Sequence, residues 1–186
     1  NKAVKTIYYQ KEKGRTALDE INLAYKEAPH LNLSISKLND RMKREFFVAK
    51  NSEKMMKRIK ASEYEKVKQR KLTQDDILEL KIERVTDDDL NSFTDEDKKA
   101  AYLYYLMNKG YTYDEKVIRT KDVTDEEYAY IAENNKSLDG FNTRLDWERS
   151  YPYGDVFRTI LGTVSDNGIP SEEKAYYLKK GYSLDD

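Results

Sequence analysis

Apolar residues recur at helical spacing along most of this chain, on segments whose other positions are largely charged. Of the 186 residues, 38% are hydrophobic and 37% are charged. A segment with so narrow an apolar stripe can bury one face against a core, while its remaining surface must stay in water. We therefore expect a thin core, built on helices that each keep a wide solvated face.

Residues that favour the first position of a helix stand before several of these stripes. A Ser, Thr or Asn side chain there accepts a hydrogen bond from a free backbone N–H, and an acidic residue three positions on can complete a capping box. The expected N-caps are Thr16, Asn39, Ser52, Thr73, Thr94, Thr124 and Ser171. The expected inward-facing residues are Leu18, Ile21, Tyr25, Ala28, Met42, Phe46, Ala49, Met55, Met56, Ile59, Leu78, Ile82, Val85, Ala100, Leu103, Tyr104, Met107, Tyr128, Ile131 and Ala132. Because the apolar phase slips between residues 39 and 85, this stretch predicts several short helices rather than one long helix.

Two other segments predict β-strands. Residues 3–9 are rich in β-branched and aromatic types. Residues 141–148 alternate between apolar and polar side chains, so this strand should place one face on a core and the other in water. Helices with few strands, not in βαβ alternation, indicate an α+β fold.

The charges nearly cancel overall but are segregated along the chain. There are 34 Lys and Arg against 35 Asp and Glu, a net charge of -1. Residues 50–71 carry nine basic and three acidic residues, a net +6, and residues 72–97 carry ten acidic and two basic residues, a net -8. One interpretation is two solvated helical faces of opposite sign that pack side by side. The other is that the basic block meets an anionic partner, such as a lipid headgroup or a wall polymer.

The residue inventory limits catalytic and metal chemistry. With no cysteine, a single histidine (His30) and seven glycines, thiol nucleophiles, two-histidine metal sites and glycine-rich phosphate loops are excluded. Asp87-Asp88-Asp89 lacks the spacing of a calcium loop and predicts the start of a helical turn. We expect no catalytic residue, cofactor or metal ion in this chain.

Three short patterns imitate the motifs of serine transpeptidases. The Ser-x-x-Lys spacing occurs at Ser34 and at Ser171, and Ser165-Asp166-Asn167 matches a second motif. With ten serines and 24 lysines in the sequence, chance alone predicts about one Ser-x-x-Lys pair. The third motif, Lys-Thr-Gly on a strand, is missing, and we interpret the patterns as caps and turns.

The segment from residue 122 onward resembles the N-terminal region of class B penicillin-binding proteins. The resemblance lies in Asp-Val-Thr-Asp-Glu-Glu-Tyr-Ala, Leu-Asp-Gly-Phe-Asn-Thr, Trp-Glu-Arg-Ser-Tyr-Pro-Tyr-Gly-Asp and Ile-Leu-Gly-Thr-Val-Ser, at 122–129, 138–143, 147–155 and 160–165. Residues 177–186 look like the approach to a transpeptidase domain, and Phe46 to Asn108 is similar to the helical insert of Gram-positive members.

The resemblance implies a helix-rich, elongated pedestal with a few antiparallel strands. Its expected parts are a partial strand and helix at 1–37, a helical insert at 38–122 and a strand-helix part at 123–186. In the family this dimerisation domain is non-catalytic and holds the domain of a peptidoglycan D,D-transpeptidase away from the membrane. The expected hinge and packing residues are Arg149, Tyr151, Pro152, Gly154 and Gly162.

The resemblance also implies a place and a set of partners. The domain should lie at the extracytoplasmic face of the cell membrane, with its anchor before Asn1, and contact other proteins of wall elongation or division. A homodimer is a further expectation, and nucleic acid is not an expected partner. Two alternatives stay open: a stand-alone helical protein-interaction module, or a weak binder of anionic polymer through residues 50–71.

Overall fold

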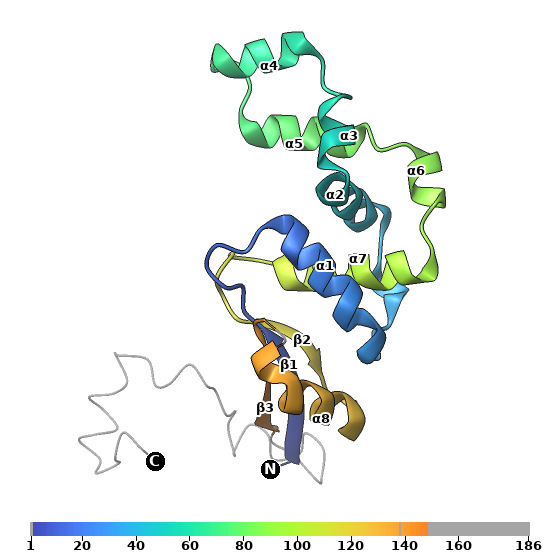
Figure 1. The fold of residues 1–186 in the computed structure, drawn as a ribbon, viewed down its shortest axis with the longest axis vertical. Helices are drawn as coiled ribbons and strands as arrows, with labels where there is room; N and C mark the ends of the chain where they lie inside the picture. Colours follow the sequence, from blue (N-terminus) through green and yellow to red (C-terminus); the bar gives the residue numbers. More distant parts are fainter. Residues whose placement is uncertain (1, 138, 149–186) are drawn as a thin grey trace, which may run out of the picture. The chain divides into compact units, whose positions relative to one another are not determined.

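The computed structural model describes residues 2–137 and 139–148 (Figure 1). Residues 3–146 form one compact unit, and the account below concerns that unit with the strand residues that adjoin it. Its elements are β1 (Lys2–Tyr9), α1 (Ala17–Glu27), η1 (Ala28–His30), η2 (Ile35–Lys37), α2 (Asp40–Lys50), α3 (Ser52–Met56), α4 (Ala61–Lys68), α5 (Gln74–Glu83), α6 (Asp87–Asn91), α7 (Asp95–Asn108), β2 (Lys116–Thr120), α8 (Asp125–Asn134), η3 (Asn135–Ser137) and β3 (Phe141–Glu148). Helices with one small sheet confirm the α+β prediction, and the expected series of short helices is confirmed in α2 to α6.

The three strands form a sheet in the order β2-β1-β3, so β1 is the central strand. β1 pairs antiparallel with β2, and the register shifts between Ile7 and Tyr8. Helix α8 packs on the side of the sheet that carries Ile7 and Tyr9, since Ile131 belongs to the same buried cluster as those two residues (Figure 1). The strand predicted at residues 3–9 is therefore confirmed as the strand that holds this sheet together.

β3 is confirmed as a strand, but the prediction that its whole apolar face lies on a core is wrong. Phe141 is buried, with its ring centroid 5.1 Å from that of Tyr9. Leu145 and Trp147, on the same face of the strand, are 52% and 69% exposed. β3 is an edge strand, and only its first residue reaches the cluster formed by β1 and α8.

Two apolar clusters make up the core. The larger joins the sheet, α1, α7 and α8, and helices α1 and α7 lie side by side in it (Figure 1). The smaller joins α2, α3 and α5, and consists of Phe47, Val48, Met55, Ile82 and Val85. Phe93 packs against both clusters, and α2 contributes Phe46 to the larger cluster and Phe47 to the smaller one. Helix α2 therefore ties the helical hairpin α4–α5 to the rest of the unit.

The capping prediction is confirmed at five positions and wrong at one. Thr16, Thr73, Thr94 and Thr124 each form a complete capping box, and Asn39 accepts from the Met42 N–H. Ser52 is the first residue of α3 rather than its cap, because α3 follows α2 after the single residue Asn51. The predicted cap at Ser171 lies outside the described residues.

The predicted stripes are correct in most positions but wrong at one position in each of four helices. Leu18, Met56, Leu78 and Ala132 are exposed rather than buried. In α1 the buried face passes through Glu20 and Glu27 in place of Leu18, and in α5 Ile77 is buried in place of Leu78. The apolar pattern cannot predict that a charged residue is buried, because it assigns every charged residue to the solvent-exposed face.

Among the described residues, no helix is long and apolar enough to cross a membrane.

The ring cluster around Phe46 should carry much of the stability of this unit. Phe46 is fully buried, with ring centroids at 5.8 Å from Tyr25, 6.1 Å from Phe93 and 5.6 Å from Tyr104. We expect Phe46→Ala to lower the free energy of unfolding by about 3–5 kcal/mol, through lost burial and a cavity. Urea unfolding measures the change. Met56→Ala, an exposed apolar truncation, is the control and should stay within about 0.5 kcal/mol of the parent chain.

Candidate functional site

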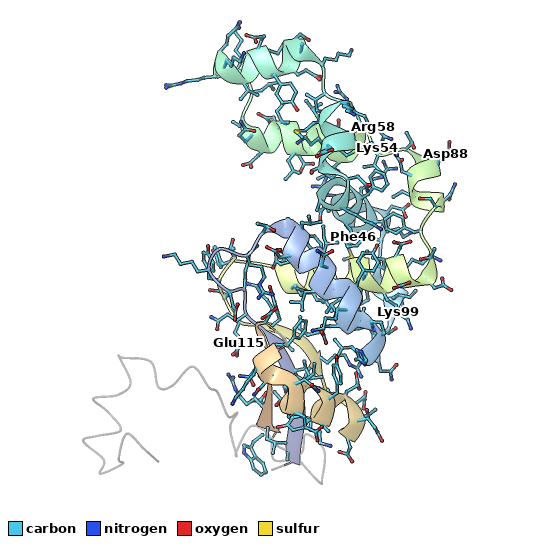
Figure 2. The ribbon with its side chains drawn as sticks, in the orientation of Figure 1. Phe46, Lys54, Arg58, Asp88, Lys99 and Glu115 are labelled. Atoms are coloured by element: carbon cyan, nitrogen blue, oxygen red, sulfur yellow. The ribbon has the colours of Figure 1, made fainter. Side chains whose placement is uncertain are left out.

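The two charged blocks meet at Asp89, the third residue of α6. Its carboxylate accepts from Arg58 Nη1 at 2.6 Å and from Lys54 Nζ at 2.9 Å, and Figure 2 labels both cations around the end of α3. The same carboxylate accepts from the Thr86 N–H at 3.0 Å and so caps α6. The hydrogen bond from Arg58 is the main reason that the pKa of Asp89 lies below its usual range.

A second junction lies at Asp97, where α7 begins. Tyr25 of α1 donates to this carboxylate, and Lys50 of α2 lies 3.0 Å from it. Burial alone would raise the pKa of Asp97, but the hydrogen bonds from Tyr25, the Thr94 cap and Lys50 outweigh it and lower the pKa. One carboxylate therefore fixes three helices against one another.

A third junction closes the α4–α5 hairpin. Arg84 holds Glu63 with two hydrogen bonds, Nη2 to Oε1 at 2.6 Å and Nη1 to Oε2 at 2.8 Å. Arg84 Nη1 also donates to the carbonyl of Arg58 at 2.6 Å. The Arg84 hydrogen bonds lower the pKa of Glu63 to about 2. Together, the pairs at Lys50, Lys54 and Arg58 confirm the interpretation that the basic and acidic blocks pack side by side.

The rest of the basic block faces water. Lys57, Lys60, Lys66, Arg70 and Lys71 are exposed, and none of them forms an ion pair with another described residue. Lys68 lies 2.6 Å from Glu65 of its own helix. The block is thus divided into a paired inner part and an exposed outer part.

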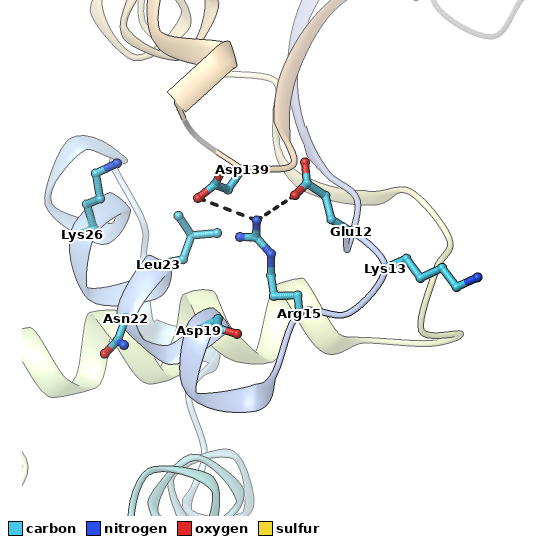
Figure 3. A pocket seen from close by; sticks show the side chains of 8 residues that line it. All are labelled: Glu12, Lys13, Arg15, Asp19, Asn22, Leu23, Lys26 and Asp139. Atoms are coloured by element: carbon cyan, nitrogen blue, oxygen red, sulfur yellow. Dashed lines mark hydrogen bonds and ion pairs between the residues drawn. The ribbon is translucent and has the colours of Figure 1, made fainter.

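A polar pocket of about 380 Å³ lies between the β1–α1 loop and the turn before β3 (Figure 3). Arg15 lies at its centre, 3.0 Å from a Glu12 oxygen and 3.7 Å from an Asp139 oxygen. The lining includes three cationic and three anionic side chains, so the pocket presents no net charge of one sign. The dashed lines in Figure 3 show that Arg15 links the β1–α1 loop to Asp139 in the turn before β3, so its role is structural.

Gly140 brings the turn before β3 close to the end of β1. The Gln10 N–H donates to the Gly140 carbonyl at 2.9 Å, and Gly140 has a φ of +103°. A Cβ at this position would lie 2.3 Å from the Gln10 carbonyl oxygen. The left-handed backbone and the close approach both require glycine here.

Three buried carboxylates were missed by sequence reasoning. Glu20 accepts from Tyr9 at 2.9 Å and Lys11 at 2.6 Å, and Glu27 is also buried, with Lys26 Nζ 3.4 Å from its Oε1. Glu127, predicted only as a capping partner, accepts from the Asn32 N–H and from Arg119 as well. Burial and the Glu20 charge raise the pKa of Tyr9. No sequence signal marks Glu20 and Glu27, since each occupies an ordinary helical position, and the capping box at Glu127 does not reveal its other partners.

The transpeptidase-like pattern at Ser34 does not form a catalytic pair. Ser34 is exposed, and its hydroxyl lies 3.0 Å from that of Ser36. His30 stacks on Tyr130, with ring centroids 4.1 Å apart, in the η1 turn. The Asp87–Asp89 run begins α6 as predicted, and no metal-binding cluster of His, Cys, Asp or Glu occurs within residues 2–137 and 139–148.

Several predicted residues lie outside the described residues. These are Arg149, Tyr151, Pro152, Gly154 and Gly162, together with Ser165-Asp166-Asn167 and the Ser171–Lys174 pair.

An apolar groove of about 590 Å³ lies among α1, α2, α5 and α7. Leu18 and Leu78, 56% and 47% exposed, are part of its lining, with Val48, Ala49 and Ile82. The two leucines that the stripe pattern placed in the core therefore lie in one exposed groove.

Comparison with known proteins identifies the family of this chain. The model of the penicillin-binding protein dimerisation domain matches residues 1–186, the whole chain, and the chain belongs to that family. Penicillin-binding protein 2A of Bacillus subtilis (strain 168) is 32% identical over 188 residues, which cover 100% of this chain and 26% of that protein. Penicillin-binding protein 2B of Streptococcus pneumoniae (serotype 4) is 27% identical over 191 residues, again 100% of this chain and 28% of that protein.

The fold agrees with solved structures. Penicillin-binding protein 2B from Streptococcus pneumoniae (strain 5204) superposes with a TM-score of 0.67 at 26% identity, over 100% of this chain and 29% of that one. The chain spans less than a third of the length of the relatives it matches.

The Asp89 junction predicts a pH-dependent stability. A carboxylate whose pKa is lower in the folded state adds stability above its unfolded pKa, 3.8 for Asp89, and loses it as the pH falls further. We expect Asp89→Asn to cost about 2 kcal/mol at pH 7, and the difference from the parent chain to shrink below about pH 4. Chemical unfolding at pH 7, 4 and 3 measures it. Asp88→Asn, at the exposed neighbour labelled in Figure 2, should change little, and an equal loss in both variants would contradict the assignment.

The Gly140 contact predicts a steric effect beyond backbone strain. Gly14 also has a positive φ, +89°, but no atom lies within 4 Å of an added Cβ. Gly14→Ala should therefore cost about 1 kcal/mol, from strain alone, whereas Gly140→Ala should cost several kcal/mol. Thermal unfolding of both variants separates the two contributions. Equal shifts in the melting temperature would show that the Gln10 contact relaxes at no cost.

Proposed function

We propose that this chain is the pedestal of a membrane-anchored peptidoglycan D,D-transpeptidase and positions its catalytic domain. The observation that carries the proposal is the family match over the whole chain, together with a coverage of 26% to 28% of the relatives. In this proposal the transpeptidase serine lies in the part of the protein that this chain does not represent.

The packing of the described unit supports a positioning role. Helix α2 contributes to both apolar clusters, and the carboxylates of Asp89, Asp97 and Glu63 join the helices at three further points. Such cross-links resist bending between the helices. A spacer that sets the distance of a catalytic domain from a membrane needs this stiffness.

The finer parts of the proposal concern place and partners. The domain works at the extracytoplasmic face of the cell membrane, held by an anchoring segment that is not in this chain. It docks other proteins of wall elongation or division, and it forms a homodimer. We keep residues 1–37, 38–122 and 123–186 as its three parts, with Arg149, Tyr151, Pro152, Gly154 and Gly162 as hinge and packing residues.

A fluorescent penicillin tests whether the chain is non-catalytic. We expect no covalent labelling of the 186-residue chain, because Ser34 has no activating lysine bonded to it in the structure. The longer parent protein, under the same conditions, should be labelled. Labelling of this chain that disappears in Ser34→Ala or Ser171→Ala would contradict the proposal.

Deletion in the parent tests the positioning role. A parent protein that lacks residues 1–186 but keeps its anchor should still react with penicillin and yet fail to support growth. Restored growth with an unrelated helical spacer of equal length would limit the role to spacing, and full growth without any insert would refute it.

A further inference from the structure

The exposed cations of the basic block lie together on the first arm of the α4–α5 hairpin, which consists of α4 and its flanking residues, 57–71, and is called the α4 hairpin below. This segment has seven Lys and Arg and two Glu, a net charge of +5. Its inward-facing charges are satisfied, Arg58 by Asp89 and Glu63 by Arg84. Lys57, Lys60, Lys66, Arg70 and Lys71 are all exposed.

The backbone concentrates several of these cations at one end of α4. Arg70 adopts a left-handed conformation, with a φ of 56°, and the Lys71 N–H then donates to the Lys66 carbonyl at 2.8 Å. This turn brings Lys66, Arg70 and Lys71 to the carboxyl end of the helix. The helix macrodipole favours cations there, so it accounts for the charges at this end of α4.

At the other end of α4 the macrodipole explains only one of the two exposed cations. Lys60 is the N-cap residue of α4, where the macrodipole is positive and disfavours a cation, whereas Lys57 is the C-cap residue of α3, where the macrodipole of that short helix favours one. The nearby carboxylates form no ion pair with these two lysines: Asp89 of the acidic block pairs with Lys54 and Arg58, and Glu63 of α4 itself pairs with Arg84. The cations at the two ends of this eight-residue helix are separated by roughly 12 Å along the helix axis, at 1.5 Å per residue.

The apolar residues of α4 decide which anionic partner fits. Tyr64 and Val67 are half-buried, and no residue of α4 is an exposed large hydrophobic. A helix that binds a lipid surface buries an apolar face in it, and α4 has none to offer. A flexible chain of anionic groups needs only a line of cations. We propose that the α4 hairpin binds a linear polymer that carries phosphate groups, through Lys57, Lys60, Lys66, Arg70 and Lys71.

Binding of inorganic polyphosphate to the 186-residue chain tests this proposal and does not depend on the proposed function. Fluorescence anisotropy of end-labelled polyphosphate should report binding at 50 mM salt. With about four to five phosphate contacts, affinity should fall with a log–log salt slope near -3, roughly 60-fold between 50 and 200 mM.

A quadruple variant identifies the surface. Replacement of Lys57, Lys60, Lys66 and Lys71 by Gln should weaken binding at least tenfold. The matched control, Gln at Lys37, Lys99, Lys109 and Lys136, changes the net charge equally at exposed positions outside the hairpin and should keep the parent affinity. Circular dichroism and the melting temperature verify that both variants are folded.

Three outcomes would overturn the proposal. One is no binding at 50 mM salt, and another is an equal loss in both quadruple variants, which would indicate a response to net charge alone. The third is tighter binding to phosphatidylglycerol vesicles than to polyphosphate, which would assign the hairpin to a lipid surface.

Discussion

The carboxylate of Asp97 holds the centre of this unit together. It completes the capping box that starts α7, and it also accepts from Tyr25 of α1 and pairs with Lys50 of α2. Helix α7 in turn packs against α1, α2, β2 and η1. Because a thin apolar stripe stabilises each helix only weakly, the geometry of these contacts depends on where α7 begins, and Asp97 fixes that point.

The same device recurs at three other helix starts. Asp89 caps α6 and binds Lys54 and Arg58, and Glu127 caps α8 and binds Arg119. Glu63 accepts from the N–H of Lys60, the N-cap residue of α4, and binds Arg84. Exposed ion pairs contribute little, but Asp89 and Glu127 are buried, and loss of one partner there would leave a charge without compensation. The caps thus supply part of the specificity that the thin core of a chain with only 38% hydrophobic residues cannot supply alone.

How much of this follows from the sequence depends on the range of the interaction. The Thr94 and Thr124 caps, the short helices before α7 and the central strand could be predicted, because each rests on neighbours within a few residues. The Thr86 cap was missed although Thr86 and Asp89 have the same spacing as Thr73 and Asp76. The second role of each cap could not be predicted, since its partner lies far away in the chain, as Lys50 does from Asp97.

Burial was predicted least well where polar side chains replace apolar ones. The pattern predicted that α1 buries Leu18, but the helix buries Glu20, whose carboxylate accepts from Tyr9 of β1 and from Lys11 shortly after that strand. That rotation leaves Leu18 in the groove beside Leu78. In β3, alternation correctly predicted a strand, yet a single strand cannot reveal that it lies at the edge of its sheet, and this position determines that Leu145 stays exposed.

The near-neutral composition conceals two different uses of charge. Where a carboxylate at a helix start faces the basic block, it forms an ion pair that holds the fold together, as Asp89 does with Arg58 and Asp97 with Lys50. Where the basic block continues past Arg58, the chain turns through α4 and its lysines meet water instead of the acidic block. The two blocks pair only along the inner part of the basic block, and the outer cations are the part of this surface that is exposed to solvent.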